Sequence, residues 1–90
     1  MICRIYDVPG ATLEQYDQVD QQMGPEAPDG ARVHIAGKTD RGFTVIEVWE
    51  SREHIDRFME SSGLGEAMQE AQVPEPEITE FEVHTFDWVN

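Results

Sequence analysis

The chain has 90 residues, with 19 Asp and Glu against 6 Lys and Arg, so its formal net charge is −13 and its pI is about 4.3. A chain of this length predicts one domain over residues 1–90, able to bury roughly 65% of its unfolded surface. The acidic charge excludes DNA, RNA and anionic lipid as partners, because binding to phosphates requires clustered Lys and Arg. The hydrophobic content of 39% is too high for an acidic disordered tail.

Cysteine use and hydropathy indicate the compartment. The single cysteine, Cys3, cannot form a disulfide within the chain, so nothing indicates an oxidising environment. The first residues lack the basic start and long apolar run of a signal peptide, and no stretch approaches the length of a membrane helix. We therefore expect a soluble cytoplasmic protein that does not bind membranes.

The first third of the chain predicts a strand, a helix and a loop. Residues 2–8 alternate apolar and polar side chains and end at a Pro-Gly pair, as in a strand. Thr12 and Gln15 have the spacing of a capping box, and apolar residues follow at helical spacing over 13–23. Residues 24–30, GPEAPDG, have the composition of a loop.

The middle of the chain predicts a β-hairpin followed by a helix. Residues 31–39 and 43–50 read as strands joined by a tight turn, TDRG. Ser51 is a suitable N-cap for a second helix, which two glycines interrupt before its apolar stripe continues to Ala71. After the extended segment VPEPE, residues 78–86 alternate as a last strand.

The predicted element order is β-α-β-β-α-β. With right-handed crossovers, this order folds most simply as a ferredoxin-like α+β sandwich, a four-stranded antiparallel sheet with both helices on one face. A two-residue turn at Asp40 and Arg41 would place His34 opposite Glu47, the register that keeps apolar residues paired.

In that register the sheet has one apolar and one mixed face. The apolar face carries Cys3, Ile5, Val33, Ile35, Ile46, Val48, Phe81 and Val83. The mixed face carries Arg4, Tyr6, His34, Ala36, Val45, Glu47, Trp49, Glu82, His84 and Phe86. Two helices can cover only one face, and an exposed sheet of Val, Ile and Phe requires a partner, so we expect no monomer.

The stretch VIEVWESREHIDRFM, residues 45–59, resembles the third strand and second helix of the dimeric α/β-barrel superfamily. It is similar above all to the small proteins grouped with antibiotic-biosynthesis monooxygenases, in which a strand ending in Val-Trp-x-Ser leads into an amphipathic helix. The segments RIYDVPGATLEQYDQV, HIAG and FEVHTF fit the same layout, so the resemblance covers nearly the whole chain. It implies a homodimer in which two sheets pack through their apolar faces into a barrel, with a ligand pocket between each sheet and its own helices.

The His34–Glu47 cross-strand pair is the strongest chemical candidate. A carboxylate orients an imidazole and stabilises its charged form, which suits general acid-base catalysis. On the same predicted face, Tyr6 and Trp49 would contact a planar ligand, and His84 would bind an oxyanion, as would Arg4. The alternative is an internal salt bridge under a helix, with the Trp in the core.

Other side chains have weaker roles. We include Phe58 and Met68, from the helical stripe, among the predicted ligand contacts. By ungapped counting from Trp49, Met68 stands where the haem-degrading relatives would have their iron-ligating histidine, which argues against haem. His54 is expected to be a solvated surface residue, and Cys3 a small hydrophobe. No ligand spacing indicates a metal, and no cofactor is expected.

Three possibilities remain open at this point. The first is a cofactor-independent oxygenase, cyclase or isomerase acting on an apolar aromatic or polyketide-like molecule, with the His/Glu pair as acid-base catalyst. The second is a non-catalytic ligand-binding or regulatory homodimer that uses the same pocket. A third possibility is a structural dimer whose pocket is filled by Trp49 and Phe58.

Overall fold

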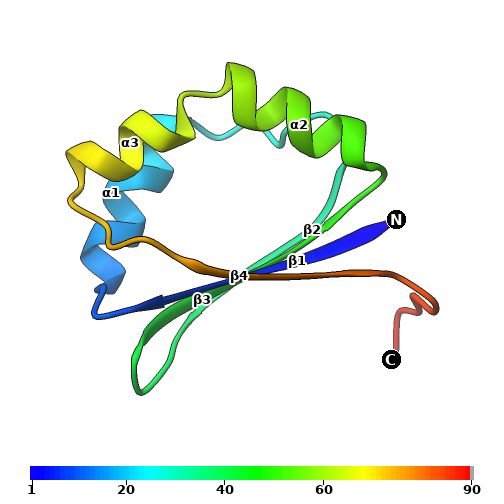
Figure 1. Ribbon diagram of the computed structural model, residues 1–90, viewed down its shortest axis with the longest axis horizontal. Coiled ribbons are helices and arrows are strands. Elements are labelled where there is room, and N and C mark those ends of the chain that lie inside the picture. Colours follow the sequence, from blue (N-terminus) through cyan, green and yellow to red (C-terminus); the bar gives the residue numbers. More distant parts are fainter. Residues whose placement is uncertain (90) are drawn as a thin grey trace.

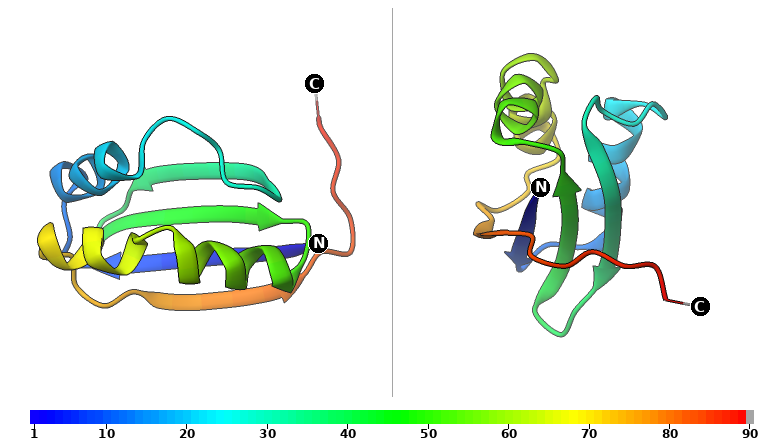
Figure 2. Two further views of the ribbon diagram at one scale, coloured as in Figure 1. Left: turned by 90° about the horizontal axis from the view of Figure 1, so that it is seen from above. Right: turned by 90° about the vertical axis from the view of Figure 1, so that its right-hand side faces the viewer.

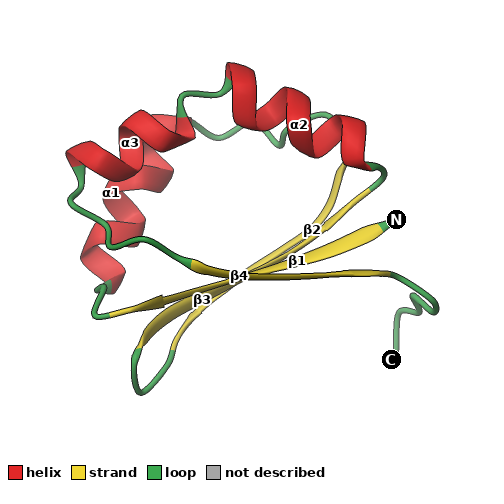
Figure 3. Ribbon diagram, in the orientation of Figure 1, coloured by secondary structure: helices red, strands yellow, loops and turns green. Residues whose placement is uncertain are grey.

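The computed structural model describes residues 1–89 and confirms the predicted α+β ferredoxin-like fold. Its strands are β1 (Ile2–Pro9), β2 (Ala31–Lys38), β3 (Gly42–Trp49) and β4 (Glu77–Glu82), and its helices are α1 (Leu13–Met23), α2 (Arg52–Ser61) and α3 (Leu64–Glu70). The strands form one antiparallel sheet in the order β2-β3-β1-β4. All three helices lie over the same face of that sheet (Figure 1; Figure 3).

Helix α1 begins with the predicted capping box. The Thr12 hydroxyl accepts from the backbone N–H of Gln15, and the Gln15 side-chain oxygen accepts from the backbone N–H of Thr12 at 2.9 Å. The Gln15 amide also donates to the carbonyls of Ala71 and Gln72, at 3.2 and 2.9 Å. One side chain therefore caps α1 and joins it to the end of α3.

The second predicted helix is two helices, which corrects the expected element order. Gly63 has the left-handed φ of 76°, which ends the run begun at Ser51 and lets the chain restart as α3. Ser51 caps α2 as predicted, accepting from the backbone N–H of His54. Figure 1 shows that α3 continues over the far half of the sheet, close to α1.

The register of the β2–β3 hairpin agrees with the sequence prediction. His34 pairs with Glu47, and the two-residue turn is closed by a hydrogen bond of 2.9 Å from the Thr39 N–H to the Gly42 carbonyl. The Gly42 N–H donates in turn to the Thr39 hydroxyl at 3.1 Å. The residues of β2 and β3 that lie on the same face of the sheet are therefore the ones that the alternating sequence pattern predicted to share a face.

The prediction of a last strand reaching Phe86 is wrong. Strand β4 ends at Glu82, and the next residue, Val83, donates one further hydrogen bond to the carbonyl of Met1 at 2.8 Å. Residues 84–89 continue beyond the sheet without strand pairing (Figure 1). His84 and Phe86 are therefore not on the mixed face of the sheet.

The core is divided between the two ends of the helix-covered face. At one end Tyr6, Val8, Phe43 and Val45 form a buried cluster under α1 with Ala11. At the other end Trp49 and Ile55 are almost wholly buried, and the Trp49 ring lies 5.2 Å from that of Phe58. On the opposite face of the sheet no helix covers Ile35 and Phe81, which are 56% and 52% exposed.

An ion-pair cluster joins α2 to the edge strand β4. Arg52 contacts both carboxylate oxygens of Glu80, at 2.6 and 3.1 Å, and the Nε of Arg4 lies 3.1 Å from the same carboxylate. The hydrogen bond from Arg52 is the main cause that lowers the pKa of Glu80.

Within residues 1–89, no helix is both long and apolar enough to cross a bilayer.

Substitution of Gln15 should cost more stability than substitution of Thr12. Thr12→Ala removes the cap and should lower the free energy of unfolding by about 1 kcal/mol. Gln15→Ala also removes both bonds to the end of α3 and should cost about 2 kcal/mol. Urea unfolding measures both, with Gln18→Ala on the exposed side of α1 as control. Equal losses for the two variants would contradict the tertiary role of Gln15.

Candidate functional site

A cavity of about 380 Å³ lies between the helix-covered face of the sheet and the helices. Figure 2 shows α1 and the segment 24–30 above the β2 side of the sheet, and α2 with α3 above the β1 and β4 side. The cavity is walled by both groups, and most of its lining is apolar. The lining includes six of the predicted site residues: Tyr6, His34, Glu47, Trp49, Phe58 and Met68.

Four polar side chains form a connected chain along the cavity wall. The Tyr16 hydroxyl lies 2.7 Å from Nε2 of His34, and Nδ1 of His34 lies 3.5 Å from Oε2 of Glu47. The indole N–H of Trp49 donates to Oε1 of Glu47 at 3.1 Å. The carboxylate side chain is only 14% exposed, whereas the imidazole is 50% exposed. The mostly buried carboxylate of Glu47 thus orients the His34 ring, and the half-exposed ring is accessible to a ligand.

The surroundings shift the titration of these groups. The hydrogen bond with Glu47 raises the pKa of His34, although partial burial opposes the shift. Burial, followed by the charge of Glu47, raises the pKa of Tyr6 to about 12. Burial and the charge of Asp20 raise the pKa of Tyr16. Both phenols therefore stay neutral at physiological pH and can donate hydrogen bonds to an anion.

Tyr16 is the site residue that the sequence prediction missed, because it was assigned to the apolar stripe of α1. The signal available was its hydroxyl, since a buried tyrosine normally requires a hydrogen-bond partner. The ring packs edge-to-face on Phe43 at 5.5 Å, which directs the hydroxyl toward His34. This contact joins α1 to β2 across the cavity.

Two predicted anion-binding residues are not brought to the cavity. His84 is exposed beyond the end of β4 and does not line the cavity. Arg4 is also absent from the lining, because its guanidinium is held by Glu80 and lies 5.2 Å from the centre of the Tyr6 ring. Tyr16 is therefore the phenol in contact with His34, and neither of the two predicted anion-binding side chains lines the cavity.

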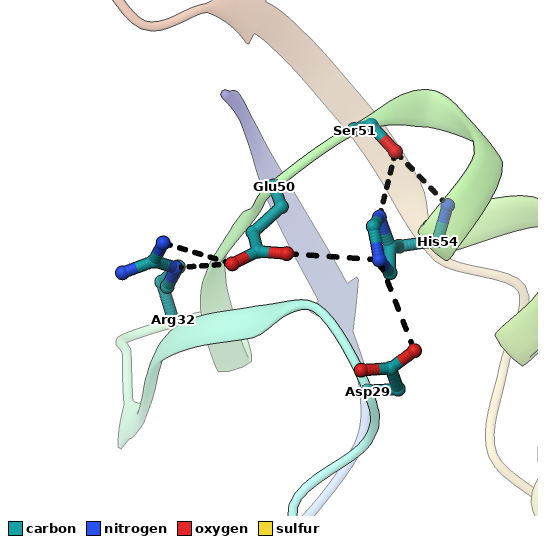
Figure 4. A network of polar contacts seen from close by, with 5 residues as sticks. All are labelled: Asp29, Arg32, Glu50, Ser51 and His54. Carbon is teal, nitrogen blue, oxygen red and sulfur yellow. Dashed lines mark hydrogen bonds and ion pairs between the residues drawn. The ribbon is translucent and has the colours of Figure 1, made fainter.

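The expectation that His54 is a solvated surface residue is wrong. Its side chain is only 20% exposed, and its Nδ1 lies 2.7 Å from the Ser51 hydroxyl (Figure 4). Its Nε2 lies 3.6 Å from a carboxylate oxygen of Glu50 and 3.8 Å from one of Asp29. Glu50 in turn binds Arg32 at 2.8 Å. We refer to these five residues, Asp29, Arg32, Glu50, Ser51 and His54, as the His54 network.

Residues 1–89 contain no group of three or more His, Cys, Asp or Glu side chains placed to hold a metal ion. Cys3 lies buried in the sheet on the face away from the cavity, and burial raises the pKa of its thiol. The polar chemistry of the cavity therefore depends on the Tyr16–His34–Glu47 group.

Comparison with known proteins identifies the fold. No protein-family model and no curated protein sequence matches the chain. A candidate antibiotic biosynthesis monooxygenase from Deinococcus radiodurans superposes with a TM-score of 0.72 and 16% identity, over 100% of this chain and 99% of that one. A variant of SnoaB, a cofactor-independent oxygenase from Streptomyces nogalater, gives 0.65 and 15%, over 94% and 92% of the two chains. The resemblance expected from the sequence is thus confirmed for the fold.

The two tyrosines of the chain should titrate above the ordinary phenol value of about 10. For Tyr6, with a pKa of about 12, folding favours the neutral phenol. Its contribution to stability is therefore complete below about pH 10 and lost as the pH rises toward 12. Tyrosinate absorbance measures the titration, and Tyr6→Phe should reduce the loss of stability. Titration of both tyrosines near pH 10 in the folded protein would contradict this assignment.

Proposed function

We propose that the protein is a cofactor-independent oxygenase acting on an uncharged, apolar aromatic or polyketide-like molecule, with His34 as the base. The observation that carries the proposal is the position of His34. Its ring faces the cavity between the phenol of Tyr16 and the carboxylate of Glu47. The similarity in fold to an oxygenase that needs no cofactor supports the same reaction class.

The charges around the cavity support an uncharged substrate. The acidic side chains among its lining residues are Asp20, Glu26 and Glu47. The one lining arginine, Arg32, is already paired with Glu50 at 2.8 Å. A substrate carboxylate or phosphate would meet these acids without a free cation to offset them, whereas an uncharged aromatic molecule would meet mainly apolar side chains.

The proposed reaction begins with removal of a proton from an activated C–H or O–H group of the substrate. Glu47 favours a proton on Nδ1 of His34, which leaves Nε2 as the acceptor that faces Tyr16. The resulting substrate anion would accept hydrogen bonds from the tyrosine hydroxyl and from the imidazolium. An electron-rich aromatic anion can itself reduce O₂, so a methylene and one O₂ give a carbonyl and one water without an external electron donor.

Replacement of His34 should abolish turnover while leaving the fold intact. In an oxygen-consumption assay with uncharged aromatic compounds that carry an activated methylene group, His34→Ala should lower kcat by at least about 100-fold, because a general base contributes a factor of that order. Glu47→Gln should also move the pH profile to lower pH, since Glu47 raises the pKa of His34. His84→Ala is the matched control, with its imidazole exposed outside the cavity. If the parent protein and all variants bind ligand but none of them takes up oxygen, the result would instead support the alternative function, a non-catalytic ligand-binding or regulatory protein.

The proposed assembly is a homodimer through the face of the sheet that carries no helices. Ile35 and Phe81 are more than half exposed there, next to Ile5, Val33, Ile46 and Val48, and this makes a continuous apolar surface. A second copy would supply the same apolar surface related by a two-fold axis.

Light scattering at physiological salt should give a mass near 20 kDa, twice the 10.3 kDa of one chain. Ile35→Lys should shift the mass toward that of one chain, because it places a charge in the apolar surface. Leu13→Lys is the control, since Leu13 is 42% exposed on α1, on the other side of the sheet. Added salt should strengthen the dimer by screening the net charge of −13. A monomer at physiological salt would overturn the proposed assembly.

A further inference from the structure

One wall of the cavity is a segment without helix or strand structure. Residues 24–28 line the cavity, and the segment 24–30 connects the end of α1 to the start of β2. Within the described chain, its backbone hydrogen bonds lie at its ends: Gly24 donates to Asp20, Ala31 donates to Pro28, and Glu50 donates to the Gly30 carbonyl. The middle of this wall therefore depends on side-chain contacts for its position.

His54 provides such a contact at the β2 end of the segment. Gly30 has a φ of 86°, and a Cβ built on it would overlap the ring of His54, so the imidazole packs directly on the glycine backbone. Nε2 of the same ring lies between the carboxylates of Asp29, in the segment, and Glu50, at the end of β3 (Figure 4). The Ser51 hydroxyl contacts Nδ1 and sets the orientation of the ring.

The packing around His54 is loose elsewhere. A second cavity, of about 310 Å³, is lined by Pro28 and Asp29 from the segment and by His54, Arg57 and Phe58 from α2. The segment is thus separated from much of α2 by open space, and His54 bridges the two. Phe58, one turn after His54, lines the main cavity as well and packs on Trp49.

We propose that His54 is a positioning residue for the ligand cavity: it holds the segment 24–30 against the β3–α2 junction and thereby sets how fast ligands enter and leave. This inference rests on the proposed function only in taking the cavity as the ligand site. His54 does not line that cavity, so it acts through Gly30 and Asp29 rather than on the ligand.

Hydrogen–deuterium exchange of the full-length protein tests the proposal without any ligand. His54→Ala should increase exchange of the backbone N–H groups of Ala31 and Glu50, which donate to the carbonyls of Pro28 and Gly30, by about tenfold. The reason is that it removes the side-chain contacts to Ser51 and the carboxylates that hold the segment in place. Exchange in α1 and β1 should stay unchanged. His54→Gln, whose amide can replace part of the polar contacts, should restore most of the protection, and His84→Ala should match the parent protein.

The second measurement is the release rate of 1-naphthol, an uncharged aromatic probe, followed by its fluorescence. His54→Ala should speed release by a similar factor, and in the oxygenase assay it should raise KM while leaving kcat within about twofold. Asp29→Ala, at an 87% exposed side chain, should give a smaller change in the same direction and leave folding intact. Unchanged exchange at the Ala31 and Glu50 amides, or an increase spread evenly over the whole chain, would overturn the proposal. If the parent protein neither binds the probe nor turns over substrate, but His54→Ala still gives the expected increase in exchange, the result would count against the proposed function and not against the role of His54 in holding the segment.

Discussion

The two-residue turn between β2 and β3 sets the register on which the rest of the site depends. Successive side chains of a strand point to opposite faces, so a slip of one residue between β2 and β3 would turn His34 away from Glu47 and from the helices, while β1 keeps β3 in place. In the observed register both face the helices, and His34 lies opposite Glu47. The same alternation places Val48 on the other face of the sheet. A hairpin of local sequence thus decides which chemistry the cavity contains.

The helices cover this face incompletely, and the cavity is the result. Helix α1 lies over one side of the sheet and α2 with α3 over the other, with the segment 24–30 completing the wall (Figure 2). Apolar packing is strong at the two ends, around Phe43 and Trp49, and weaker between them. The parts above the cavity are therefore held by polar contacts such as those of Gln15 and His54, each contributing on the order of 1 kcal/mol. A wall held in this way can open locally while the sheet stays intact.

The charged side chains behind the net charge of −13 have defined positions in the structure. Four of the five arginines lie in ion pairs: Arg4 and Arg52 with Glu80, Arg32 with Glu50, and Arg41 with Glu77. These pairs join strand β4, helix α2 and the start of β2 to their neighbours, and they leave the cavity apolar and bordered by acids. The acidic composition that argued against phosphate-bearing partners also disfavours anionic small molecules in the cavity.

The sequence by itself determined the features that depend on neighbouring residues. These were the order of strands, the capping box of Thr12, the loop 24–30 and the hairpin register, because capping, turn chemistry and alternation act over a few residues. Only the tertiary structure decided that Tyr16 reaches His34 and that His54 packs on Gly30, since each contact joins elements whose relative position is set by packing across the sheet. The same holds for the cavity, because its volume is the space that these packed elements leave unfilled.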